Sequence, residues 1–331
     1  MFTLNDLQRA ATLIARFVPP TPQYAWPLLA QRTGAEVWVK HENHTPTGAF
    51  KVRGGLIYME RLKRERPYVR GVVSATRGNH GQSLAFAGSR FEVPVVIVVP
   101  HGNSVEKNAA IRALEAGLIE YGRDFEAARE EAGRLAAKQS LEFAPSFAPD
   151  LVLGVATWAL ELFLAVPKLD VLYVPIGLGS GICGAILVRD LLGLKTAIVG
   201  VQAEGAATYA RSLAEKRPVA LDRAETRADG IATRLPDTNA LAIIAAGADR
   251  IVTVGDPAIA VAVRAYWEDT HNIAEGAGAA ALAALLQERE AMAGRRVGLV
   301  LSGGNIDLAL FRSWVLNDPR CVSSDEHSAL S

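Results

Sequence analysis

The sequence predicts an α/β fold with two parallel or mostly parallel sheets and helices on both faces of each. Short apolar runs of strand length alternate with segments of helical period, which is typical of parallel α/β architecture. These runs fall into two series along the chain. With 331 residues, of which 50% are hydrophobic, the chain can bury a core large enough for two domains.

The first series of apolar runs predicts one four-stranded unit. Helical stretches such as SVEKNAAIRALEAG and DFEAAREEAGRLAAKQ separate its members. The predicted strands are residues 71–76, 93–100, 118–122 and 141–145.

The second series predicts a larger sheet, to which an upstream run at residues 36–42 also belongs. The other predicted strands are residues 171–176, 196–203, 249–255 and 296–303. The charged segment 63–71 and the proline-containing segment 144–150 bracket the first series. We therefore predict a small α/β domain of residues 64–148, inserted into a large domain of residues 1–63 and 149–331.

Two segments bear on membrane targeting. The N-terminal residues carry Asp6 and Arg9 at amphipathic spacing and lack the order of a signal peptide, so we expect a docked helix. Residues 171–188 contain no charged side chain and reach the length of a membrane span. Pro175 and the glycines that follow it would break such a helix, so we read a strand, a loop and a helix here. The prediction is a cytoplasmic protein that does not enter a membrane.

Charge and cysteine content exclude several classes of protein. The 35 basic and 35 acidic residues cancel, and no run of like charge predicts a nucleic-acid or membrane partner. Cys183 and Cys321 are the two cysteines, which are too few for a disulfide framework or a cysteine-based zinc cluster. A small neutral or zwitterionic ligand and a reducing compartment fit best.

Two candidate sites lie in the first quarter of the chain. Lys51 stands between Phe50 and Val52, and burial among apolar residues would let this lysine lose its proton and form a Schiff base. A lone lysine is otherwise an ordinary surface residue. In residues 74–88 a predicted strand ends in polar residues and glycines, where open α/β sheets bind ligands. The alternative is a simple turn with Asn79 as the helix cap.

Two further segments also follow predicted strands. GLGSG at residues 177–181 precedes a helix, whose N-terminus can bind phosphate. It could instead be a dinucleotide loop, although the full glycine pattern is incomplete and Glu204 is the nearest acidic candidate for a ribose. LSGGNID at residues 301–307 contains Ser302 and is either a ligand-binding turn or a tight turn capped by Asn305.

Together and in this order, the four segments resemble fold-type II pyridoxal 5′-phosphate (PLP) enzymes, whose fold is like that of the tryptophan synthase β subunit. The resemblance is to the threonine dehydratase, serine dehydratase and serine racemase family. AFKVRGG is similar to its lysine motif, TRGNHGQS to its S-S-G-N-H-[AG]-Q loop, GLGSG to its tetraglycine loop, and SGGNID to its S-G-G-N-x-D segment. Residues 228–232 and 274–282 resemble two further family segments. The similarity extends from Pro20 to Asp307.

The resemblance implies roles for individual residues. Lys51 would carry PLP and act as the catalytic residue, Phe50 would pack on the ring, Asn79 would bind the 3′-hydroxyl, and Ser302 would face the pyridine nitrogen. The cofactor phosphate would lie on Gly177, Leu178, Gly179 and Ser180. The substrate would contact Thr76, Arg77, Gly78, Asn79 and His80. A neutral hydroxyl beside the pyridine nitrogen makes the ring a weaker electron sink, which favours elimination over transamination.

The sequence departs from the family pattern at three places. Arg77 replaces a serine that delivers a proton in serine racemases, and a guanidinium is a poor acid or base, so racemisation loses support. Leu178 and Ser180 replace glycines, which preserves the backbone donors. Only Glu204 matches the family's cation site, because Ala210 stands where a carboxylate is expected, so we predict no bound metal.

The predicted function is β-elimination of a β-hydroxy amino acid, with L-threonine and L-serine as reference substrates, to give a 2-oxo acid and ammonia. The open alternatives are a dehydratase for a bulkier or acidic substrate of the phenylserine or hydroxyaspartate type, an amino-acid racemase, a nicotinamide-dependent dehydrogenase and a non-catalytic metabolite-binding protein. We expect a homodimer, because the family often pairs. The chain ends near residue 331 without an effector-binding domain, so we expect no inhibition by isoleucine.

Overall fold

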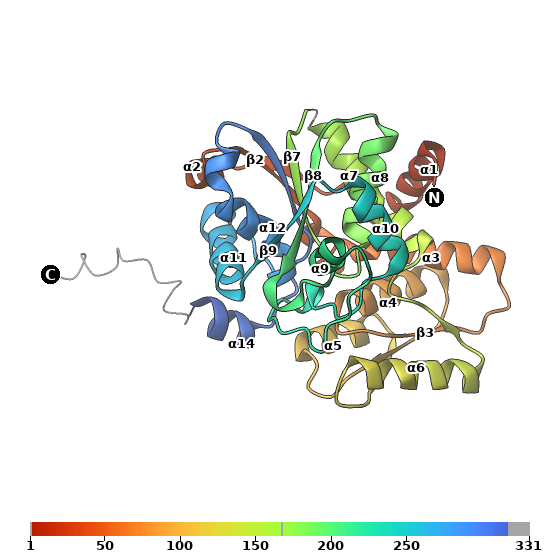
Figure 1. Cartoon of the computed structure of the whole chain (residues 1–331). Helices are drawn as coiled ribbons and strands as arrows, with labels where there is room; N and C mark the ends of the chain where they lie inside the picture. Colours follow the sequence, from red (N-terminus) through yellow and green to blue (C-terminus); the bar gives the residue numbers. More distant parts are fainter. Residues whose placement is uncertain (1, 167, 317–331) are drawn as a thin grey trace.

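Two sheets form the framework of the chain, and the computed structural model describes residues 2–166 and 168–316 (Figure 1). The larger sheet has six strands in the order β1-β2-β10-β7-β8-β9, and the smaller has four in the order β5-β4-β3-β6. Helices cover both faces of each sheet. The predicted α/β fold class is confirmed.

The six-stranded sheet contains every strand of the second predicted series. Its pairs are parallel except for β1, which runs antiparallel to β2 at the edge. Its strands are β1 (Gln23–Ala25), β2 (Glu36–His41), β7 (Val171–Pro175), β8 (Ala197–Ala203), β9 (Arg250–Val254) and β10 (Arg296–Leu301). The sequence did not predict β1, because it has three residues and no buried side chain to give it an alternating pattern.

The four-stranded sheet is built from the chain between β2 and β7, and its pairs are all parallel. Its strands are β3 (Val72–Ala75), β4 (Val95–Val99), β5 (Gly117–Glu120) and β6 (Glu142–Phe143). Two sheets formed by separate stretches of chain support the division at residues 64–148, which stays a prediction. We call residues 72–143 the small-sheet unit.

The helices sort by the sheet that they cover. On the six-stranded sheet, one apolar core includes side chains of α11 and α12, and another includes those of α7, α8 and α10 (Figure 1). On the four-stranded sheet, α3 and α4 share one core and α6 the other. The helices are α1 (Leu4–Ile14), α2 (Pro27–Thr33), α3 (Lys51–Glu65), α4 (Asn79–Phe91), α5 (Val105–Ala113), α6 (Phe125–Gln139), α7 (Pro149–Ala165), α8 (Ser180–Leu191), α9 (Thr208–Glu215), α10 (Thr238–Gly247), α11 (Asp256–Thr270), α12 (Gly276–Gln287), α13 (Arg289–Met292) and α14 (Leu308–Leu310).

Both segments that bear on membrane targeting fold as expected. Thr3 and Asp6 form a capping box at the start of α1, and this helix packs against α7. Residues 171–188 divide into β7, a loop and α8. Within the described chain, we find no helix that combines the length and the apolar character needed to span a bilayer. Cys183 is a buried free thiol, and Cys321 lies outside the described residues.

Close helix packing fixes the position of Lys51 at the start of α3. A Cβ atom added at Gly55 would lie 2.3 Å from Ser83 Oγ on α4, and one added at Gly154 on α7 would lie 2.2 Å from the Arg53 carbonyl oxygen. Ser83 Oγ also donates a 2.6 Å hydrogen bond to the Lys51 carbonyl. The glycines therefore allow α4 and α7 to approach α3 closely and hold its first turn in place.

Candidate active site

A cavity of about 1100 Å³ is lined by residues from both sheets. Residues that follow β3, β7 and β10 meet in it, as expected for ligand binding at the carboxyl ends of strands. Every residue that the resemblance places at the cofactor or the substrate lines this cavity: Phe50, Lys51, Thr76, Arg77, Gly78, Asn79, His80, Gly177, Leu178, Gly179, Ser180 and Ser302. The structure thus brings the predicted residues together, while the roles of those residues stay predictions.

Lys51 is held against the end of β10. The backbone N–H of Phe50 donates a 3.0 Å hydrogen bond to the Ser302 carbonyl, and Ala49 forms an isolated bridge with Gly303. Lys51 Nζ lies 5.3 Å from the centroid of the Phe50 ring. Burial lowers the pKa of Lys51 to about 8, and the Glu275 carboxyl opposes this shift. The amine therefore becomes neutral, and nucleophilic, at much lower pH than a surface lysine.

The loop at residues 177–180 has a geometry suited to an anion. Gly179 is the N-cap of α8 and has φ = 101°, a conformation that favours glycine. A Cβ atom at Gly177 would lie 2.5 Å from the Gly230 carbonyl, and one at Gly179 would lie 2.8 Å from Ala240 Cβ. The first N–H groups of a helix have no partner within the helix and carry partial positive charge. Because these residues line the cavity, an anion can bind at the N-terminus of α8.

The loop at residues 76–80 leads into α4. Gly78, and not Asn79, is the N-cap of α4, so the interpretation of Asn79 as a helix cap is wrong. The Asn79 side chain instead donates to Glu275 and accepts from Asn305. Asn305 is not a cap either: the N-cap of α14 is Asp307, and the Asn305 amide donates to the Thr47 carbonyl and to Asn79.

Two neighbours of Asn79 differ sharply in environment. Arg77 is exposed, and within residues 2–166 and 168–316 no acidic group or hydrogen-bond acceptor pairs with it. His80 is buried, and burial lowers its pKa to about 3, so the imidazole is neutral at working pH. Arg77 is thus a cation available to a ligand.

Among the charged cavity residues that the sequence did not single out, three interact with one another: Lys107, Asp229 and Glu275. The last two lie in the segments 228–232 and 274–282, whose family resemblance gave a signal but no particular residue. Lys107 lies four residues before Ile111 on the buried face of α5. A lysine on the same helix face as a buried apolar residue was the one feature of the sequence that could have indicated a buried, paired lysine.

The residues at the family's cation position have other surroundings in the structure. Glu204 is exposed in a short 3₁₀ turn and does not line the cavity, and the Ala210 N–H donates to the Gln202 side chain. In the described part of the chain, no group of three or more His, Cys, Asp or Glu side chains is arranged to hold a metal ion.

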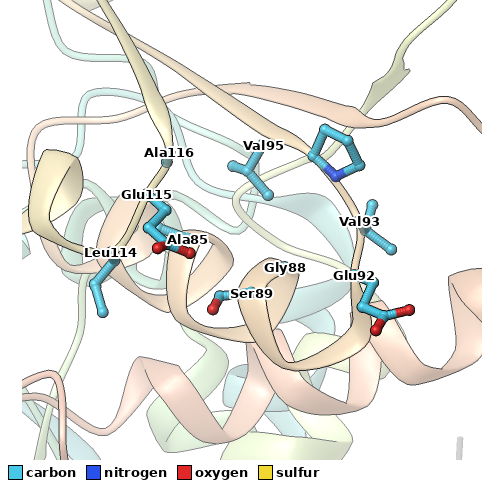
Figure 2. A pocket seen from close by; sticks show the side chains of 10 residues that line it. Ala85, Gly88, Ser89, Glu92, Val93, Val95, Leu114, Glu115 and Ala116 are labelled. Carbon is cyan, nitrogen blue, oxygen red and sulfur yellow. The ribbon is translucent and has the colours of Figure 1, made fainter.

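A second cavity, of about 330 Å³, lies in the small-sheet unit (Figure 2). It is lined where α4 leads into β4 and where α5 leads into β5, and it includes Ser89, Glu92 and Glu115. These connections precede the strands, whereas the predicted site residues follow them. None of the predicted site residues lines this second cavity.

Comparisons with known proteins identify the family of this chain. The family model described as "Pyridoxal-phosphate dependent enzyme" matches residues 14–303. L-threonine ammonia-lyase of Thermotoga maritima is 34% identical over 309 residues, which is 93% of this chain and 77% of that protein. L-threo-3-hydroxyaspartate ammonia-lyase of Saccharomyces cerevisiae is 32% identical over 95% of this chain and 96% of that protein.

A solved structure, that of maize serine racemase, superimposes with a TM-score of 0.88 at 26% identity, covering 94% of this chain and 96% of that one. The family resemblance inferred from the four segments is confirmed. PLP has an aldehyde at one end and a phosphate at the other, which agrees with a buried lysine and a helix N-terminus lining one cavity. The chain belongs to the family of pyridoxal-phosphate dependent enzymes.

Proposed function

We propose that the enzyme catalyses β-elimination of a β-hydroxy amino acid, with L-threonine and L-serine as the first substrates to test, to give a 2-oxo acid and ammonia. The observation that carries this proposal is the buried amine of Lys51 in the same cavity as the anion-binding N-terminus of α8. Relatives named as ammonia-lyases match nearly the whole chain and support the reaction class.

The residues present fit PLP. Lys51 would bond to its aldehyde carbon, the backbone N–H groups of residues 177–180 would hold its phosphate, and Phe50 would pack on its ring. The Ser302 hydroxyl would hydrogen-bond to the pyridine nitrogen, and the Asn79 amide would donate a hydrogen bond to the 3′-oxygen. When bound, PLP withdraws electrons from the bonds at Cα of an attached amino acid.

The protein's own groups would then move the protons. The Lys51 amine, once free and neutral, removes the Cα proton, and the electrons of that C–H bond form a Cα–Cβ double bond as hydroxide leaves Cβ and is protonated to water. The released enamine tautomerises and is hydrolysed to a 2-oxo acid and an ammonium ion. The substrate carboxylate would lie at residues 76–80, where the N-terminus of α4 favours an anion.

The low pKa of Lys51 predicts when the amine can react. Wild-type protein stripped of PLP should bond to added PLP at a rate that rises about tenfold per pH unit and levels off near pH 8, because only the neutral amine attacks an aldehyde. Borohydride trapping at a series of pH values, followed by peptide mapping, measures this rate. A plateau reached only above pH 10, as for a surface lysine, would contradict the proposed environment.

A panel of amino acids assayed for 2-oxo acid and ammonia tests the reaction itself. Incubation with L-serine in deuterated water should give pyruvate much faster than D-serine, because Arg77 is a poor proton donor for the opposite face of Cα. Formation of D-serine as fast as pyruvate would favour a racemase, the activity for which one structural relative is named.

Arg77 favours an acidic β-hydroxy amino acid as the second candidate substrate. Its unpaired guanidinium can bind a second carboxylate, and one relative is named for L-threo-3-hydroxyaspartate. We expect Arg77→Met to lower kcat/KM for that substrate by about 10–100-fold, as for a hydrogen bond between charged groups, with little effect on L-threonine. Equal losses on both substrates would instead place Arg77 at the α-carboxylate.

Arg123→Met is the matched control for this comparison. Arg123 also lines the cavity, but its side chain is 95% exposed and lies 3.7 Å from the Asp124 carboxylate. A loss as large as that of Arg77→Met would show a general effect of cavity charge.

We also propose a cytoplasmic homodimer. Exposed apolar side chains on neighbouring elements of the six-stranded sheet, Tyr24 on β1, Leu28 on α2 and Trp267 on α11, support a protein–protein surface there. Light scattering of the purified protein would give the mass of a dimer, and a monomer mass at all concentrations would exclude it.

A further inference from the structure

Lys107, Asp229 and Glu275 form a charged cluster at the cavity. Lys107 Nζ lies 2.8 Å from Asp229 Oδ2 and 3.3 Å from Glu275 Oε2. The Lys107 and Glu275 side chains are 6% and 3% exposed, whereas that of Asp229 is 34% exposed. The Lys107 ammonium and the Glu275 carboxyl therefore form a buried ion pair, whereas the Asp229 carboxylate is partly exposed to solvent.

Glu275 also contacts Asn79, whose amide has only one favourable orientation in this setting. Asn79 Nδ2 donates a 2.6 Å hydrogen bond to Glu275 Oε1, and Asn305 Nδ2 donates a 2.8 Å hydrogen bond to Asn79 Oδ1. Asn305 is itself oriented by the Thr47 carbonyl, which can only accept. An ionised carboxylate can also only accept, so it requires the N–H side of Asn79.

The hydrogen bond between Glu275 and Asn79 therefore selects one side of the amide only while Glu275 is ionised. Burial raises the pKa of Glu275, while the Lys107 ammonium acts in the opposite direction. The titratable groups that face Glu275 from the elements around it are Lys107 on α5, Asp229 in the 3₁₀ turn Asp229–Ile231, and Lys51 on α3. A protonated Glu275 could donate to Asn79 and would no longer select one side of its amide.

The cluster joins the two sheets. Lys107 belongs to the small-sheet unit, whereas Asp229 and Glu275 belong to segments packed on the six-stranded sheet. The packing is tight, because a Cβ atom at Gly78 would lie 2.5 Å from Lys107 Cδ and one at Gly303 would lie 2.6 Å from Glu275 Oε1. Glycine at residues 78 and 303 therefore leaves the space that these two charged side chains occupy.

We propose that Lys107 is a positioning residue that keeps Glu275 ionised, so that Glu275 acts together with Asn305 to hold the Asn79 amide with its N–H side towards Glu275. The consequence for the cofactor rests on the proposed function, in which the remaining Asn79 N–H serves the 3′-oxygen of PLP. An amide turned the other way would present an oxygen to that oxygen. Lys107 thus acts through Glu275 and needs no contact with the substrate.

Infrared spectroscopy of the PLP-free protein near pH 7 tests the charge of Glu275 directly. Lys107→Met should show the carbonyl band of a protonated carboxylic acid. Wild type and Lys107→Arg should not show this band. The double variant Lys107→Met/Glu275→Gln should not show it either, because the acid that causes the band has been removed. The proposal is wrong if Lys107→Met shows no such band, or if wild type already shows one that Glu275→Gln removes. Should Lys107→Met not fold, the double variant should, because it leaves no unpaired charge at residue 275. Failure of both to fold would also overturn the proposal.

Titration with PLP tests the effect on Asn79. Lys107→Met should weaken PLP binding about fivefold relative to wild type, the value of one hydrogen bond, where the infrared band shows Glu275 protonated. The ratio of the two dissociation constants should approach one as pH rises and the band disappears. A ratio that is the same at every pH would mean a merely structural role for Lys107. If wild type does not bind PLP, the proposed function is wrong. The infrared experiment uses PLP-free protein, so it would still show whether Lys107 keeps Glu275 ionised.

Discussion

Replacing Lys51 with alanine should abolish measurable release of 2-oxo acid from L-threonine. The loss removes a base within the cavity, and a well-placed base contributes about 10²–10⁴-fold to the rate. It also removes the only lysine other than Lys107 among the residues that line the cavity, and Lys107 is already paired with two carboxylates. Steady-state assays with excess PLP would measure the effect.

Lys63→Ala is the control for Lys51→Ala. Lys63 lies on the same helix, α3, but it is exposed and does not line the cavity. It should retain full activity, and both variants should have the circular dichroism of wild type, because alanine is a good helix former. Activity of Lys51→Ala within tenfold of wild type, or borohydride labelling of another lysine, would remove Lys51 from the mechanism.

Gly179→Asp should weaken PLP binding so much that the enzyme loses its cofactor. The residue has φ = 101°, and any Cβ atom would lie 2.8 Å from Ala240 Cβ, so the loop must shift. The new carboxylate would also repel the cofactor phosphate at the helix N-terminus. Losing one donor to an anion costs about 1.5–3 kcal/mol, so we expect PLP affinity to fall by more than about 100-fold when repulsion is added. Loss of visible absorbance on dialysis would report it.

Two variants separate the causes in this experiment. Gly193→Asp places the same side chain at another left-handed glycine, φ = 62°, just beyond the other end of α8, where no atom lies within 4 Å of the added Cβ. It should keep PLP. Gly179→Ala adds the strain without the charge and should lose less affinity than Gly179→Asp. Unchanged affinity in Gly179→Asp would mean that phosphate binds elsewhere.

The strands and the main site residues could be predicted because both are local features of the sequence. Apolar runs such as residues 171–176 mark strands buried on both faces, and the glycines and polar residues after them mark the ligand-binding ends. Strand β1 carries no such pattern, because its pairing with β2 is what makes it a strand.

The roles of Asn79 and Asn305 depend on partners distant in sequence. As helix or turn caps they would satisfy neighbouring backbone groups, which is the usual local use of asparagine. In the structure, Asn79 bonds to Glu275 and Asn305 bonds to Thr47, across 196 and 258 residues. The same holds for Lys107, whose two carboxylate partners lie more than 120 residues away. A single sequence contains no periodicity that could reveal such contacts.

The strand order also has a consequence for folding during synthesis. Strand β2 pairs in parallel with β10, which stands between β2 and β7 in the sheet. His41 at the end of β2 leaves the ribosome 260 residues before Leu301 at the end of β10. At about 5–20 residues per second, β2 is synthesised on the order of 10–50 s before β10, and its edge stays unpaired for that time, while the small-sheet unit already has all its strands. The nascent chain is therefore exposed to edge-to-edge aggregation for most of its synthesis, until its last strand arrives.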